Sequence, residues 1–249
     1  MNTNELDKNY QHALQIAQKA GDFLINYKDN KVINNDGKDV KLSADKEAEK
    51  IIIDYLSKNS DIPILSEECG FVNKKDTDLL WIIDPLDGSL NYLRDIPSCC
   101  VSIGLWKADQ PLLGVVYDFN RQEMFGGIVG KGAWLNEKEM KVSNISDFSQ
   151  AIMVMGFPSW GDYSESGLLS FTKVLQKYKK VRLLGSAALS LAYVACGRVE
   201  AYAERGINKW DIGAGAAIVL AAGGRLNYMK KMDKNKVDIL LDNGLLSEK

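Results

Sequence analysis

The architecture of this chain is set by one run, Leu79-Leu80-Trp81-Ile82-Ile83-Asp84-Pro85-Leu86-Asp87-Gly88-Ser89-Leu90-Asn91-Tyr92-Leu93-Arg94-Asp95-Ile96. Its apolar start, Leu79 to Ile83, is short and ends at Asp84-Pro85, which is typical of a buried strand. Gly88 permits a tight turn, and Ser89 is a suitable N-cap for a short helix, Leu90 to Leu93. The run therefore predicts a strand, a tight turn and the N-terminus of a helix.

Asp84 and Asp87 are three residues apart across a proline, so their carboxylates can converge beyond the strand end. A lone Asp-Pro-x-Asp-Gly is more often a simple turn than a site. Carboxylates beside a helix N-terminus can, however, bind a hard cation, while the free N–H groups bind a phosphate. Two further acidic segments favour a site: Ser66-Glu67-Glu68, after the apolar run Ile62 to Leu65, and Trp210-Asp211, at the start of a small-residue helix.

Together the three segments resemble the motifs of the inositol monophosphatase family of metal-dependent, lithium-sensitive phosphatases. The shared order is Glu-Glu, then Asp-Pro-Leu-Asp-Gly-Ser, then Trp-Asp, and the resemblance covers nearly the whole chain. It implies a layered α/β fold, a five-layered αβαβα sandwich. Within this single compact unit, residues 1–148 would carry most metal-binding motifs, and residues 149–249 would complete the active site.

Composition places the chain among ordinary soluble proteins of one large domain or two intimate halves, with 249 residues and a formal net charge of −2. That charge gives no reason to expect nucleic acid or an acidic membrane as a partner. No apolar run approaches the ~20 residues of a membrane helix, and the N-terminus lacks a signal-peptide profile. The four cysteines form no Cys-x-x-Cys pair, so we expect reduced thiols in the cytoplasm, with Cys99 and Cys100 on opposite faces of one strand.

The first half of the chain predicts two amphipathic helices followed by an antiparallel sheet. Apolar spacing indicates helices over Asn4–Lys28 and over Ala44–Ser57, the second capped by Ser43. The polar segment 30–41 between them reads as a loop or hairpin. Short turns join the later strand-like runs, which favours antiparallel pairing; these runs are Ser98–Trp106, Leu112–Asp118 and Glu123–Val129.

The second half predicts alternating strands and helices, which indicates an α/β layered arrangement. The expected strands are Ala151–Met155, Val181–Leu184, Glu200–Glu204 and Val237–Leu241. The expected helices are Leu168–Tyr178, Gly185–Cys196 and Asp211–Ala222. The segment Asn227–Val237 before the last strand is polar and basic, and no strand is predicted for it.

The acids Glu67, Asp84, Asp87 and Asp211 would repel one another if clustered without a cation. Oxygen ligands without histidine or cysteine favour Mg²⁺ over zinc. The resemblance implies two or three Mg²⁺ ions per active site. Glu67, Asp84 and the Leu86 carbonyl would hold one ion, and Asp84, Asp87 and Asp211 would hold a second, at which Li⁺ inhibits.

The resemblance implies hydrolysis of a phosphomonoester by a metal-activated water. Glu67 and the Ser89 hydroxyl would hold that water, and the N–H groups of Gly88 and Ser89 would bind the phosphate. Asp45 has two readings: it complements the dipole of its helix, or it contacts the metal site through water, as an aspartate does in the family. The family often has threonine three residues before this aspartate, where this chain has Leu42.

Substrate contacts are predicted on the C-terminal half. Gly185-Ser186-Ala187 resembles the Gly-Thr-Ala segment that lines the sugar pocket in the family, although it also reads as a turn capped by Ser186. Glu204 matches a glutamate that binds ring hydroxyls, although it also reads as a solvated charge at a strand end. Met155-Gly156-Phe157-Pro158 resembles another pocket segment.

These features predict a phosphatase for a small polyol or sugar phosphate, with inositol 1-phosphate as the first candidate substrate. The alternative within the superfamily is a 3′(2′),5′-bisphosphate nucleotidase or a fructose-1,6-bisphosphatase. A third reading is a regulatory binding protein on the same scaffold. The resemblance also implies a homodimer.

Overall fold

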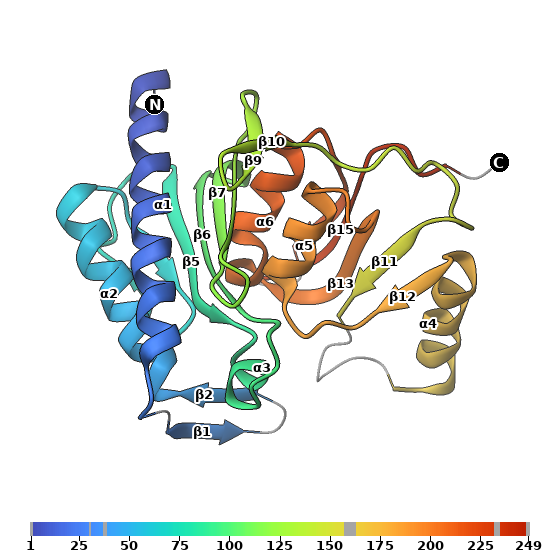
Figure 1. Cartoon of the computed structure of the whole chain (residues 1–249), viewed down its shortest axis with the longest axis horizontal. Coiled ribbons are helices and arrows are strands. Elements are labelled where there is room, and N and C mark those ends of the chain that lie inside the picture. The colour runs from blue at the N-terminus through green and yellow to red at the C-terminus, as the bar shows by residue number, and fades with distance from the viewer. Residues whose placement is uncertain (1, 30, 37–38, 157–162, 232–234, 248–249) are drawn as a thin grey trace.

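The computed structural model describes residues 2–29, 31–36, 39–156, 163–231 and 235–247 as five stacked layers (Figure 1). Two helices, an eight-stranded sheet, two more helices, a five-stranded sheet and one helix follow one another. The expected αβαβα sandwich is therefore confirmed. None of the helices in the described parts of the chain is long and apolar enough to cross a membrane.

The first layer consists of α1 (Thr3–Asn26) and α2 (Ser43–Asn59), joined by the hairpin of β1 (Val32–Asp36) and β2 (Asp39–Leu42). In α1 the residues at helical spacing are buried against the sheet: Tyr10, Ala13, Ile16, Ala17, Ala20 and Leu24. A capping box between Asn2 and Glu5 starts this helix. The apolar periodicity of the sequence therefore identified the correct face of α1.

The second layer is a sheet with the strand order β10-β9-β8-β7-β6-β5-β3-β4. All neighbouring pairs are antiparallel except β3 and β5. The strands are β3 (Ile64–Ser66), β4 (Gly70–Val72), β5 (Leu79–Asp87), β6 (Cys100–Lys107), β7 (Gln110–Asp118), β8 (Glu123–Ile128), β9 (Gly132–Leu135) and β10 (Lys138–Met140). The predicted antiparallel sheet is confirmed. Cys99 belongs to the apolar core on one side of this sheet and Cys100 to the core on the other, as predicted, although Cys99 lies just before β6 and not within it.

The third layer contains α5 (Ala187–Ala195) and α6 (Lys209–Ala221), which are covered by a sheet on each side (Figure 1). The small residues of α6 allow it to lie directly on the larger sheet. Gly104 and Gly114 are directly opposite each other on β6 and β7, and a Cβ on either would collide with the backbone of α6 at Gly213 or Ala214. The Trp106 indole N–H donates to the Gly213 carbonyl at 2.7 Å.

We expect Gly104→Ala to lower the free energy of unfolding by about 1–3 kcal/mol, because the added methyl group overpacks the contact between α6 and β6. Gly104 does not have a positive φ, so the expected loss comes from the clash and not from backbone strain. Thermal unfolding followed by circular dichroism measures it. A melting temperature equal to that of the wild type would mean that α6 is not seated this closely.

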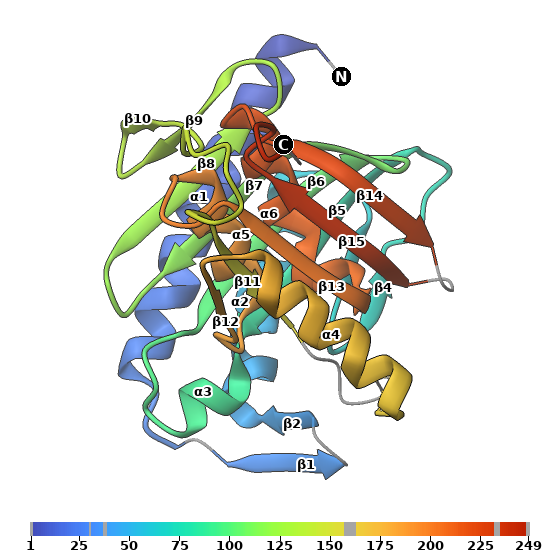
Figure 2. The ribbon, with the colours of Figure 1, turned by 90° about the vertical axis from the view of Figure 1, so that its right-hand side faces the viewer.

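The fourth layer has the strand order β12-β11-β13-β15-β14, and α4 (Glu165–Lys177) crosses its outer face (Figure 2). The strands are β11 (Ile152–Met155), β12 (Lys180–Arg182), β13 (Ala201–Asn208), β14 (Arg225–Lys231) and β15 (Lys236–Asp242). No strand was predicted for the polar, basic segment Asn227–Val237, but residues up to Lys231 belong to β14. The strand was missed because β14 is an edge strand, where lysines are common and the sequence looks polar.

Two predicted helix caps differ in the structure. Leu42 and not Ser43 is the N-cap of α2, and the Ser43 hydroxyl instead accepts from the Lys31 N–H. The short helix α3 (Ser89–Leu93) has Gly88 as its N-cap, with Ser89 as the first helical residue. Ser43 and Ser89 are each the first residue of a helix, and the residue before each is the N-cap. The Ser89 hydroxyl is therefore available to other partners.

Candidate active site

The candidate active site is a hollow of about 670 Å³ between the end of β5, the turn at Gly185–Ala187, β13 and the start of α6. Both halves of the chain contribute to its wall. Apart from Asp45, which lies behind Ser89, all predicted site residues line it: Glu67, Asp84, Leu86, Asp87, Gly88, Ser89, Gly185, Ser186, Ala187, Glu204 and Asp211. Phe157 and Pro158, which were also predicted to line the pocket, lie outside the described residues.

The two aspartates of the central motif project from a bulge in β5. The strand does not end at Ile83 as expected but continues to Asp87, with Asp84 opposite Ser102 and Asp87 opposite Cys100. The register shifts between the two aspartates, and the Leu86 N–H donates to Asp84 Oδ1 at 3.0 Å. A bulge of this kind redirects side chains, so both carboxylates reach the same hollow.

Gly88 makes the turn that follows, with φ at +91°. A Cβ at this position would also lie 2.7 Å from the Ser98 carbonyl oxygen. Only glycine tolerates both constraints, because it has no Cβ and populates positive φ freely. This turn brings the first N–H groups of α3 beside the aspartates.

Asp45 and Ser89 form a polar link behind the bulge. The Ser89 hydroxyl lies 2.8 Å from Asp45 Oδ1 and 2.9 Å from the Leu86 carbonyl, and its single proton can be donated to either oxygen. Asp45 Oδ2 accepts from the Leu42 N–H at 2.5 Å. Burial raises the pKa of Asp45 to about 6. Asp45 therefore touches the site through Ser89 as well as completing the start of α2.

The acids in the hollow make one another harder to ionise. Burial, followed by the negative charges of Glu68 and Asp45, raises the pKa of Glu67 to about 8. Burial and then the charge of Glu67 raise the pKa of Asp84 and of Asp211 well above the usual range. Without a cation, full ionisation of this cluster would be strongly unfavourable.

The donor set fits a hard cation, because carboxylates and the Leu86 carbonyl supply only oxygen ligands. Among the described residues, no three histidine, cysteine or acidic side chains already form a group that could hold an ion. Helices α2, α5 and α6 all begin near the hollow, and their positive ends favour the negative charge gathered there.

Asp87 joins the two halves of the chain. It accepts from the Ser186 hydroxyl at 2.6 Å, from the Ala188 N–H at 2.7 Å and from the Ala187 N–H at 3.3 Å, all at the start of α5. Ser186 is also the N-cap of that helix. A carboxylate from the first half thus satisfies N–H groups of the second.

Glu204 lies on β13 with its Oε2 accepting from the Tyr202 hydroxyl at 2.6 Å. It packs directly on Gly156, where any Cβ would collide with its carboxylate. Burial raises the pKa of Glu204 to about 6. The side chain is therefore held against the hollow and is not a freely solvated charge.

Sequence reasoning missed two charged residues around the Glu67 turn. Lys41 lines the hollow and pairs with Glu68 at 3.1 Å, and the Glu68 side chain is only 5% exposed. Glu49, on α2, is buried and accepts hydrogen bonds from the same turn. Both residues looked like ordinary surface charges, since neither belongs to a motif.

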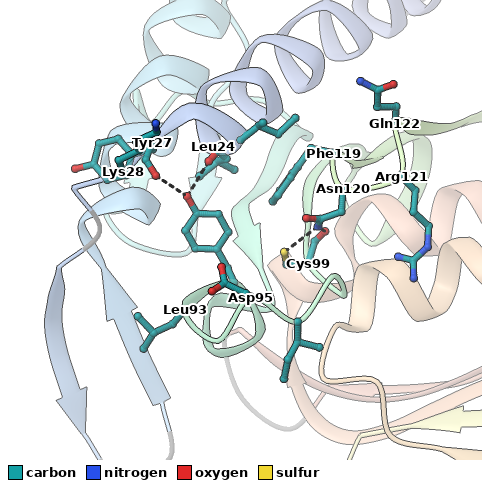
Figure 3. Close-up of a pocket in the computed structure, with 13 residues that line it drawn as sticks. Leu24, Tyr27, Lys28, Leu93, Asp95, Cys99, Phe119, Asn120, Arg121 and Gln122 are labelled. Carbon is teal, nitrogen blue, oxygen red and sulfur yellow. Dashed lines mark hydrogen bonds between the residues drawn. The ribbon is translucent and has the colours of Figure 1, made fainter.

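A second hollow, of about 790 Å³, lies between the end of α1, the segment after α3 and the turn between β7 and β8 (Figure 3). Two of its polar groups have partners within it: the Tyr92 hydroxyl donates to the Leu24 carbonyl, and the Asn120 amide contacts Cys99. None of the predicted catalytic or metal-binding acids lines it. The chemistry of the chain is therefore concentrated in the first hollow.

Comparison with known proteins agrees with this geometry. Residues 5–248 match the inositol monophosphatase family. The chain is 37% identical to a Nus factor SuhB of Xylella fastidiosa (90% of this chain, 83% of that protein). It is 38% identical to an inositol-1-monophosphatase of Synechocystis sp. (84% and 75%). The solved structure of inositol monophosphatase from Anabaena (Nostoc) sp. superposes with a TM-score of 0.85 at 35% identity, covering 96% of this chain and 92% of that one.

A layered α/β fold with a cluster of buried acids at a strand end defines the class of this protein as a phosphatase. The chain belongs to the inositol monophosphatase family.

Proposed function

We propose that this protein is a Mg²⁺-dependent phosphomonoesterase that hydrolyses a small polyol or sugar phosphate, with inositol 1-phosphate as the leading candidate. One observation carries the proposal: the four acids Glu67, Asp84, Asp87 and Asp211 share one hollow with the start of α3 and with Glu204. This arrangement supports a cation, a phosphate and a polyhydroxylated leaving group side by side.

In this proposal the four acids and the Leu86 carbonyl would hold two or three Mg²⁺ ions. When bound, Mg²⁺ lowers the pKa of a water molecule and neutralises charge on the phosphate. Glu67 and the Ser89 hydroxyl orient the attacking water, and Asp45 keeps the Ser89 hydroxyl in place through their 2.8 Å contact. The N–H groups of Gly88 and Ser89 would hold phosphate oxygens at the start of α3.

Substrate choice depends in this proposal on Glu204. An ionised carboxylate only accepts hydrogen bonds, so it suits the hydroxyl groups of a cyclitol or sugar and repels a second phosphate. Arg205 and Lys209 could have offset that repulsion, but neither lines the hollow, and Lys209 lies 3.8 Å from Asp109. The name of the Synechocystis relative, inositol-1-monophosphatase, agrees with this preference.

The alternative substrate is a bisphosphate, because Lys236 also lines the hollow and could attract a second phosphate. A comparison of kcat/KM for inositol 1-phosphate, fructose 1,6-bisphosphate and 3′-phosphoadenosine 5′-phosphate decides between the two. A higher kcat/KM for either bisphosphate would favour a bisphosphate over inositol 1-phosphate as the substrate. A purely regulatory role is the weakest of the three readings, since all four acids are retained.

Glu204→Ala is expected to lower kcat/KM for inositol 1-phosphate by about 5- to 150-fold, because leaving a buried hydroxyl group unpaired costs about 1–3 kcal/mol. Turnover of 4-nitrophenyl phosphate, which has no ring hydroxyls, should change little. Tyr202→Phe removes only the hydroxyl that donates to Glu204, and it should produce a smaller loss in the same direction. Equal turnover of inositol 1-phosphate by Glu204→Ala and wild type would contradict the assigned role.

We also infer a homodimer in the cytoplasm. The apolar side chains of Leu90, Ile96 and Leu183 are about half exposed, and Asn91 of α3 donates to the Leu184 carbonyl, so the three residues belong to one region. All four cysteines are free thiols, which suits a reducing compartment. Light scattering after size-exclusion chromatography would measure the oligomeric state.

A further inference from the structure

Helix α2 carries two buried carboxylates on one face, Asp45 and Glu49, which are four residues apart. Asp45 holds the Ser89 hydroxyl, as described above. We propose that Glu49 is a positioning residue that fixes the turn carrying Glu67, so that one helix sets both groups that hold the attacking water. This inference rests on the proposed function and adds a residue to its machinery.

One oxygen of Glu49 gathers three donors from the end of β3 and the turn after it. Glu49 Oε1 accepts from the Ser66 hydroxyl, from the Glu68 N–H at 3.2 Å and from the Cys69 N–H at 3.1 Å. Ser66 is fully buried and is the last residue of β3. The three donors surround Glu67 in the sequence, so the contacts of Glu49 determine the path of the backbone through Glu67.

The same turn is held from its other side by Lys41. The Lys41 ammonium group pairs with the Glu68 carboxylate at 3.1 Å, and the Glu68 side chain is 5% exposed. With the backbone bound to Glu49 and the side chain of Glu68 bound to Lys41, the turn has two anchors. Glu67 is left to line the hollow with Asp84.

A buried carboxylate is costly unless its hydrogen bonds repay the loss of water. Glu49 meets that condition because one of its oxygens accepts three hydrogen bonds. A residue needed only for packing on α2 would not require an acceptor at this point. The geometry is therefore that of an outer partner of a metal ligand, whose loss typically costs about 10–100-fold in metal affinity or activity.

The test compares Glu49→Ala, Glu49→Gln and Glu47→Ala. Glutamine keeps an acceptor oxygen without the charge, and Glu47 is an exposed glutamate on the same helix. Mg²⁺ binding to each metal-free protein is measured by isothermal titration calorimetry, and the Mg²⁺ concentration for half-maximal activity is compared with the KM for substrate. Melting temperatures show whether each variant is folded.

Glu49→Ala is expected to weaken Mg²⁺ binding by about 10-fold or more, while the substrate KM at saturating Mg²⁺ changes little. Glu49→Gln should restore most of the affinity, and Glu47→Ala should match the wild type. If Glu49→Ala does not fold, Ser66→Ala, which removes one of the donors, replaces it with the same expected direction.

Wild-type Mg²⁺ affinity in Glu49→Ala would overturn the inference, and so would a Glu49→Gln variant as weak as Glu49→Ala, since the acceptor would then not be what matters. A wild-type protein that binds Mg²⁺ but hydrolyses no phosphomonoester would refute the proposed function alone. A wild-type protein that binds no Mg²⁺ would refute both.

Discussion

Asp84→Asn will lower kcat/KM for phosphomonoesters by more than about 100-fold, beyond the range expected for loss of an outer partner of a metal ligand. Asp84 is 2% exposed and is the acid proposed to contact both ions, so the amide removes charge from the centre of the site. Steady-state assays over a wide range of Mg²⁺ concentrations measure the effect. Recovery of wild-type turnover at high Mg²⁺ would show that Asp84 is dispensable.

Thermal unfolding in EDTA supplies the control for folding. Asp84→Asn should melt at a higher temperature than the wild type, because it removes a buried like charge and keeps an oxygen to accept from the Leu86 N–H. Asp87→Asn should melt lower, because its single amide oxygen cannot replace the carboxylate that accepts from Ser186, Ala187 and Ala188. A higher melting temperature for Asp84→Asn and a lower one for Asp87→Asn would show that charge repulsion dominates at Asp84 and hydrogen bonding at Asp87.

Mg²⁺ should stabilise the protein strongly at pH 8 and weakly at pH 5. The native pKa of Glu67 is raised to about 8, whereas an unfolded glutamate titrates near pH ~4.3. Between these values the native state binds more protons than the unfolded state, so the stability of the metal-free protein falls as pH rises. Mg²⁺ binds the deprotonated acids. At a Mg²⁺ concentration of about 100 times its Kd, binding adds about 2.7 kcal/mol to the free energy of unfolding.

Melting curves in EDTA and in Mg²⁺, recorded from pH 5 to pH 8, measure this linkage. About 2.7 kcal/mol corresponds to a rise of roughly 5–11 °C for a chain of this size. NaCl at equal ionic strength is the control for screening, and Asp84→Asn should show a much smaller response. A metal-free protein that became more stable toward pH 8 would contradict the raised pKa values.

Apolar periodicity predicted most of the helices and strands, because periodicity and burial agree over most of the chain, whereas the five-layered order was implied by the family resemblance. The prediction from sequence was wrong where a local rule was overridden. Pro85 suggested the end of a strand, yet β5 continues to Asp87, because a bulge accommodates a residue that cannot donate to the ladder. No strand was predicted for the polar, basic segment that contains most of β14, although an edge strand requires only one partner, which β15 supplies.

At the site, the sequence identified residues that belong to compact motifs. It missed residues whose role depends on contacts with distant segments of the chain. Glu67, Asp87 and Asp211 were found from their neighbours in the chain. Glu49 was not, because a glutamate on an amphipathic helix usually faces water, and only the packing of α2 on β3 shows that this one does not. The roles of Ser186 and Glu204 also depend on partners distant in sequence or supplied by the fold.

The position of α5 and α6 between two sheets has a consequence for cooperativity. Both helices come from residues after 148, yet they pack on one face of a sheet built from residues before 148, over β5 to β9 (Figure 1). Residues 1–148 expressed alone would expose that face to water, and residues 149–249 alone would leave their helices covered on one side only. We therefore expect the two fragments to be unfolded or aggregated separately and to regain structure only when mixed, so that this chain behaves as one folding unit in a split-protein experiment.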